Sequence, residues 1–138
     1  MRTSLTSPAG STGTARILLV DDHEISRAAY RALLRAEGVD VVADLAATDH
    51  ALAAARALRP DVAFVDITPG VDAGLGIASS LRALAGPPIV VLTSTAARAE
   101  FGPAINGYRF IAKADICAAA IARLTPATET GWPEPRNR

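Results

Sequence analysis

Five polar residues that could act together in chemistry each follow a short apolar segment of the chain. The segments are rich in Val, Ile, Leu and Phe, which is typical of buried β-strands. Because the carboxyl ends of parallel strands meet at one edge of a sheet, we expect these side chains to lie close together, although more than ninety residues separate the first from the last. They are Asp21, Asp22, Asp66, Thr93 and Lys113.

These residue types suit the binding of a divalent cation and a phosphate. Neighbouring carboxylates repel one another unless a cation lies among them, and Mg²⁺ is commonly held by one or two carboxylates, waters and a phosphate oxygen. The Thr93 hydroxyl could donate to a phosphate oxygen, and the ammonium of Lys113 could balance phosphate charge. Lys113 is the only lysine beside thirteen arginines, which favours a position that requires a compact ammonium. As single residues, the acids and Thr93 could instead cap helices, but capping does not explain three acids at one edge.

The elements that must position these residues alternate along the chain. Apolar runs alternate with Ala-, Leu- and Arg-rich segments of helical period, which predicts a doubly wound α/β fold, a parallel sheet with helices on both faces. Gly102-Pro103 predicts that the helical segment 95–105 is short or broken. The expected strands are Arg16–Val20, Val39–Ala43, Asp61–Asp66, Ile89–Thr93 and Tyr108–Ala112, and the expected helices are Ile25–Ala36, Thr48–Leu58, Ala73–Leu84 and Asp115–Leu124.

Composition narrows the class of protein. The 138 residues have no net charge, a pI near 6.7 and no basic cluster, which argues against binding nucleic acid by phosphate neutralisation. The single Cys117 leaves no internal disulfide and no cysteine metal site. No apolar run reaches the roughly 20 residues of a membrane span, so we expect a cytoplasmic protein. One folded domain is expected over 15–124, between a disordered tail at 1–14 and a Pro-rich tail at 125–138.

Four segments together carry a resemblance to a known family: RILLVDDHE, AFVDITPG, VVLTS and FIAK. With the 44-residue interval from Asp22 to Asp66, they resemble the receiver domain of bacterial two-component response regulators over about residues 15–124. The resemblance implies a flavodoxin-like sheet with strand order 2-1-3-4-5. It also implies that a histidine kinase or phosphotransfer protein donates a phosphoryl group to Asp66, giving an aspartyl phosphate.

The same resemblance assigns roles to the other residues. Asp21 and Asp22 would hold Mg²⁺ together with Asp66 and the backbone carbonyl of Thr68. Thr93 and Phe110 would form the conformational switch, although Phe110 could also be a plain core aromatic.

Three features depart from the family pattern. Asp66-Ile67-Thr68-Pro69-Gly70 places Pro-Gly one residue closer to the acceptor than usual. Ala114 follows Lys113 where many members have proline. The interval from Thr93 to Lys113 is about two residues short, within the broken helix.

The sequence therefore predicts a stand-alone receiver that switches contacts with an unknown downstream protein. It would assist its own phosphorylation and dephosphorylation without being an enzyme on another substrate, and a homodimer is left open. The first alternative is a degenerate receiver-like binding module that is not efficiently phosphorylated, and a less favoured one is a Mg²⁺-dependent phosphohydrolase. A hydrolase triad has no support because neither His23 nor His50 has a Ser or Cys partner at a strand end, and His23 is expected to be an exposed first-turn residue.

Overall fold

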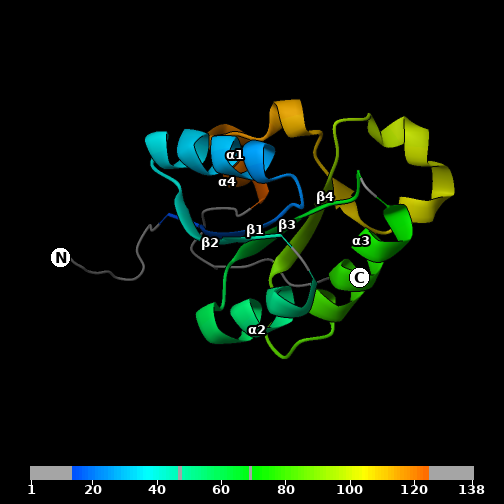
Figure 1. Cartoon of the computed structure of the whole chain (residues 1–138), viewed down its shortest axis with the longest axis horizontal. Coiled ribbons are helices and arrows are strands. Elements are labelled where there is room, and N and C mark those ends of the chain that lie inside the picture. Colours follow the sequence, from blue (N-terminus) through cyan, green and yellow to red (C-terminus); the bar gives the residue numbers. More distant parts are fainter. Residues whose placement is uncertain (1–13, 47, 69, 125–138) are drawn as a thin grey trace.

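A five-stranded parallel sheet with strand order β2-β1-β3-β4-β5 forms the centre of the molecule (Figure 1). The computed structural model describes residues 14–46, 48–68 and 70–124. This topology confirms the predicted doubly wound α/β fold and its strand order. The strands are β1 (Arg16–Val20), β2 (Asp40–Leu45), β3 (Val62–Asp66), β4 (Ile89–Thr93) and β5 (Arg109–Phe110).

Helices cover both faces of the sheet, α1 and α4 on one side and α2 and α3 on the other (Figure 1). Within the described ranges, none of them is long and apolar enough to cross a membrane. The helices are α1 (Glu24–Ala36), α2 (Thr48–Leu58), α3 (Val71–Arg82) and α4 (Ala118–Leu124), with 3₁₀ helices η1 (Arg98–Ile105) and η2 (Lys113–Asp115).

The side chains of β3 explain why both faces need a cover. Val62 and Phe64 belong to the core beneath α1 and α4, whereas Ala63 and Val65 belong to the core beneath α2 and α3. All five residues of this central strand are buried. Because side chains alternate across a strand, Asp66 falls on the same face as Phe64, which directs its carboxylate toward the side of α1.

Several predicted boundaries were right and others were wrong. β1, α2 and β4 have the predicted limits. The last helix begins at Ala118 instead of the predicted Asp115, because Ile116 has extended backbone angles (φ −75°, ψ 119°) that separate η2 from α4. β5 is only two residues long, α3 begins and ends two residues earlier than predicted, and β2 and β3 each begin one residue later, with β2 extending to Leu45.

The segment between β4 and β5 is broken as predicted. Gly102 has φ 60° and ψ −149°, a left-handed conformation that glycine adopts without strain from a side chain, and Pro103 follows it. This region therefore forms two short 3₁₀ turns that meet at a kink at Gly102, together labelled η1, in place of a regular α-helix. The predicted tails lie outside the described residues, apart from Thr14.

Candidate functional site

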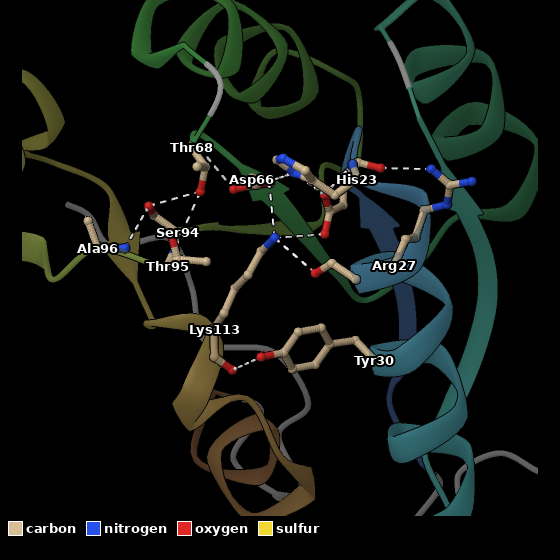
Figure 2. Close-up of polar contacts among 11 residues, drawn as sticks. His23, Arg27, Tyr30, Asp66, Thr68, Ser94, Thr95, Ala96 and Lys113 are labelled. Carbon is tan, nitrogen blue, oxygen red and sulfur yellow. Dashed lines mark hydrogen bonds and ion pairs between the residues drawn. The ribbon is translucent and has the colours of Figure 1, made fainter.

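The ends of β1, β3 and β4 bring three of the predicted residues to one edge of the sheet. Asp21 directly follows β1, and its backbone N–H donates to the Leu45 carbonyl at 2.9 Å. Asp66 is the last residue of β3 and pairs in register with Thr93, the last residue of β4. Residues distant in sequence therefore converge as expected for the carboxyl edge of a parallel sheet, and Figure 2 shows Asp66 there together with Lys113.

Lys113 joins the two buried acids. Its Nζ donates to Asp21 Oδ2 at 2.9 Å, to Ser26 Oγ at 3.1 Å and to Asp66 Oδ2 at 3.2 Å. The backbone of Lys113 is fixed by an N–H donation to the Ser94 carbonyl at 2.9 Å. Lys113 is 5% exposed, so its compact ammonium is buried between two carboxylates.

The pKa values of Asp21 and Lys113 move in the directions that keep both groups charged. Burial by itself would raise the pKa of Asp21, but the hydrogen bond from Lys113 and the backbone N–H of His23 outweigh it, and the pKa is lowered. Burial would likewise lower the pKa of Lys113, but the hydrogen bond to Asp21 and the charge of Asp66 outweigh it, and the pKa is raised. Both shifts therefore favour the charged forms of Asp21 and Lys113.

Thr68 and Ser94 position the loops beside Asp66. The Thr68 N–H donates to Asp66 Oδ1 at 2.9 Å, which fixes the rotation of that carboxylate. The two hydroxyls of Thr68 and Ser94 lie 3.0 Å apart in a hydrogen bond, and the Ala96 N–H donates to Ser94 Oγ at 3.0 Å. The loop after β3 is thus attached to the loop after β4. Pro69, on which the prediction of a shortened loop depends, lies outside the described residues.

Thr93 carries a buried hydroxyl with no hydrogen-bond partner among the described residues. It is 3% exposed and lies on the same sheet face as Asp66, because the two residues are paired in parallel register. A buried polar group without a partner costs on the order of 1–3 kcal/mol. The hydroxyl is therefore available to donate to an anion placed beside Asp66.

The structure separates the two residues of the acidic pair and adds His23. Oxygen atoms of Asp21 and Asp66 and a nitrogen of His23 lie within 4.8 Å of one another, a set that could hold a metal ion. His23 Nδ1 is 3.5 Å from Asp21 Oδ1 and 3.6 Å from Asp66 Oδ2. Asp22 is exposed and lies outside this set in the part of the chain that the structure describes. His23 is exposed as predicted, but it is the N-cap residue before α1 and not part of the first turn, and the prediction gave it no role in the site.

Phe110, the predicted switch residue, packs away from the acids. It pairs in register with Leu92, the residue before Thr93. Its half-buried ring contacts the ring of Phe101 in η1, with centroids 5.9 Å apart and an interplanar angle of 47°. Phe110 therefore connects the end of β4 to the broken helix, in the core beneath α2 and α3.

One face of α1 contributes residues that the sequence interpretation missed. Tyr30 donates its hydroxyl to the Lys113 carbonyl at 2.7 Å, and Ser26 contacts the ammonium. Arg27 donates to the Asp21 carbonyl at 2.8 Å and to Asp44 Oδ1 at 3.0 Å. Ser26, Arg27 and Tyr30 follow His23 by 3, 4 and 7 residues. This helical period could have identified the face.

Comparisons with known proteins show what this chain is similar to. A family model described as the response regulator receiver domain matches residues 17–115. The chain is 42% identical over 90 residues to a protein-glutamate methylesterase/protein-glutamine glutaminase of Anaeromyxobacter dehalogenans, covering 64% of this chain and 26% of that protein. It is 41% identical over 80 residues to the DNA-binding response regulator MtrA of Mycobacterium tuberculosis, covering 57% and 34%. The chain thus matches only about a quarter to a third of the length of these relatives.

Solved structures show the same relationship. The receiver domain of the response regulator NarL from Mycobacterium tuberculosis aligns with a TM-score of 0.63 and 29% identity, covering 80% of this chain and 91% of that one. The receiver domain of a modulated diguanylate cyclase from Desulfovibrio desulfuricans aligns with a TM-score of 0.64 and 29% identity, covering 80% and 90%.

Proposed function

Because this chain belongs to the response regulator receiver domain family, we propose that it accepts a phosphoryl group on Asp66 from a histidine kinase or a phosphotransfer protein. The observation that carries the proposal is the buried ammonium of Lys113, held between Asp21 and Asp66 at the carboxyl edge of the sheet. A positive charge in this position can neutralise the oxygens of a phosphoryl group on Asp66.

The reaction needs positioning more than covalent activation. An oxygen of the Asp66 carboxylate attacks the phosphorus of the donor's phosphohistidine, and the phosphorus–nitrogen bond breaks with its electron pair remaining on the imidazole. Thr68 holds the carboxylate through its backbone N–H. Lys113 and the unpartnered Thr93 hydroxyl then have phosphoryl oxygens as partners.

The donor set at this edge fits Mg²⁺. Carboxylate oxygens are the ligands that Mg²⁺ prefers, and Asp21 and Asp66 supply them from adjacent strands. Asp22 and the Thr68 carbonyl are the further ligands that the family predicts. The ion would supply positive charge next to the transferred group.

We propose that Thr93 and Phe110 carry the change to a protein-binding surface. Movement of the Thr93 hydroxyl toward a phosphoryl group would alter the end of β4, to which Phe110 is paired through Leu92. The contact of Phe110 with Phe101 extends this path to η1. The chain would then signal in the cytoplasm by changing its contacts with a downstream protein, assisting only its own phosphorylation and dephosphorylation.

A second candidate is a receiver-like binding module that is not efficiently phosphorylated. The position of Asp22 favours it, because an exposed Asp22 outside the acidic set leaves one predicted Mg²⁺ ligand displaced.

Incubation with acetyl phosphate and Mg²⁺, followed by intact mass measurement, tests the proposal. We expect one phosphoryl group on the wild type and none on Asp66→Asn, because the amide is neither nucleophile nor anion. Asp72→Asn, an exposed acid on α3, is the matched control and should label like the wild type. Equal labelling of Asp66→Asn would place the nucleophile elsewhere, and no labelling of the wild type would favour the second candidate.

A further inference from the structure

His23 occupies an unusual place for an exposed residue, because its imidazole faces both buried acids. It directly precedes α1, and its own backbone N–H donates to Asp21 Oδ1 at 2.8 Å. That hydrogen bond fixes the backbone of His23, from which the side chain extends. Nδ1 then lies 3.5 Å from the same Asp21 oxygen and 3.6 Å from Asp66 Oδ2, as Figure 2 shows for the pairing of His23 with Asp66.

We propose that His23 is a further metal ligand, and that with Asp21 and Asp66 it forms a mixed nitrogen and oxygen set that also accepts a first-row transition-metal ion such as Zn²⁺. The inference deepens the proposed function, since it concerns the same acidic edge. Imidazole nitrogen suits Zn²⁺, Co²⁺ and Ni²⁺, whereas Mg²⁺ takes oxygen ligands and retains its waters. Three protein ligands with open positions for water or a phosphoryl oxygen are typical of accessible zinc sites.

The distances suit such an ion. Zinc lies about 2.0–2.2 Å from histidine nitrogen and carboxylate oxygen, so two ligands in a tetrahedral arrangement lie roughly 3.4 Å apart. The separations of 3.5 and 3.6 Å are close to that value without rearrangement of the backbone. The His23 side chain is 55% exposed, which leaves an approach for the ion and freedom for small adjustments of the ring.

Lys113 leaves one oxygen of Asp21 free for this arrangement. Its ammonium contacts Oδ2 of Asp21, whereas His23 faces Oδ1 of the same carboxylate. Lys113 and His23 can therefore use different oxygens of Asp21, and only Asp66 Oδ2 lies near both. Asp22 lies outside the set, so a transition-metal ion held by these three ligands does not require it.

The alternative is that His23 only donates a hydrogen bond to the carboxylates. Glutamine is a useful substitute, because its amide can still donate a hydrogen bond but is a poor ligand for zinc. His23→Gln therefore separates a ligand from a hydrogen-bond donor. His50, the other histidine of the chain, is exposed on α2 and gives the matched control His50→Gln.

Calorimetric titration of the untagged full chain with Zn²⁺ and separately with Mg²⁺ tests the inference. All proteins carry Cys117→Ser, which removes the one thiol, and one pH is used because ligand protonation weakens binding. We expect His23→Gln to lower the Zn²⁺ affinity by at least about tenfold and to change the Mg²⁺ affinity by less than about twofold. Asp22→Asn should lower the Mg²⁺ affinity by at least about tenfold and change the Zn²⁺ affinity by less than about twofold. His50→Gln should change neither the Zn²⁺ nor the Mg²⁺ affinity.

Imidazole resonances give a second readout. Zn²⁺ should shift the ¹⁵N resonances of His23 and leave those of His50 in place. An unshifted His23, or equal Zn²⁺ affinity in His23→Gln and the wild type, would overturn the inference. Labelling of the wild type by acetyl phosphate with Mg²⁺ separates the two proposals: an unlabelled wild type would contradict phosphoryl transfer, whereas the zinc titrations decide the role of His23 independently.

Discussion

The ammonium of Lys113 lies 2.9 Å from Asp21 Oδ2 and 3.2 Å from Asp66 Oδ2, so one buried cation joins the ends of β1 and β3 to the chain that follows β5. A carboxylate pair at the end of adjacent strands would repel without it.

Lys113→Ala should make the metal-free protein less stable and strengthen its binding of Mg²⁺. Removal of one partner of a buried pair leaves uncompensated charge and costs about 3–5 kcal/mol, while the carboxylates lose a competitor for the ion. Urea unfolding with and without Mg²⁺ measures both effects. Arg123→Ala, an exposed cation on α4, is the control. Weaker Mg²⁺ binding by Lys113→Ala would contradict the role of the ammonium as a competitor.

Mg²⁺ should raise the melting temperature of the wild type by mass action, because the unfolded chain has no comparable cluster. At one hundred times the dissociation constant the gain is about 2.7 kcal/mol. Asp22→Ala should remove most of this shift if its carboxylate turns toward the ion, as the family predicts. A full shift in Asp22→Ala would show that Asp21 and Asp66 hold the ion without it.

Lys113→Arg should keep the fold and Mg²⁺ binding nearly intact but impair the response around Phe110, since a planar guanidinium cannot replace a compact ammonium between two carboxylates. The measurement is the change of amide chemical shifts over residues 94–116 on adding beryllium fluoride as a phosphoryl mimic. Identical changes in both proteins would exclude Lys113 from the switch.

The Tyr30 hydroxyl should make the free energy of unfolding depend on pH in the alkaline range. Burial raises the pKa of Tyr30 against the opposing charge of Lys113, and Asp21 adds to the rise. The pKa of tyrosine in the unfolded chain is about 10, and below that pH the contribution of Tyr30 to the free energy of unfolding is fully present. Because the folded pKa is raised, this contribution is lost as the pH rises through the folded pKa. Urea midpoints between about pH 9 and 11 should therefore fall more steeply in the wild type than in Tyr30→Phe. Parallel curves would contradict the prediction.

Gly74→Ala should destabilise the protein, because the added Cβ would clash with Ile67, the residue after Asp66. A Cβ on Gly74 would overlap Ile67 Cγ2 and lie 3.2 Å from the Ile67 Cα, so α3 and the end of β3 would have to separate, at a cost of about 1–3 kcal/mol. Gly76→Ala is the matched control on the same helix. Its Cβ would meet no atom within 4 Å, and it should stabilise α3 by about 0.5–1 kcal/mol. Equal effects in thermal unfolding would rule out the predicted contact.

The sequence by itself determined the fold class and most of the edge that carries the site. Runs such as Ile89–Thr93 have the composition of strands buried on both faces, and this pattern is local in sequence. Strand ends in a parallel sheet share one edge, so the meeting of Asp66, Thr93 and Lys113 followed from topology.

Only the tertiary structure decided which neighbouring side chains point into that edge. Asp22 and His23 are adjacent in sequence, and the turn from β1 into α1 leaves the first exposed and directs the second toward Asp66. The hydrogen bond from Tyr30 to the Lys113 carbonyl spans 83 positions of sequence. Side-chain direction after a strand depends on the backbone angles of the turn and on packing against a helix from elsewhere in the chain, and residue types alone do not specify either.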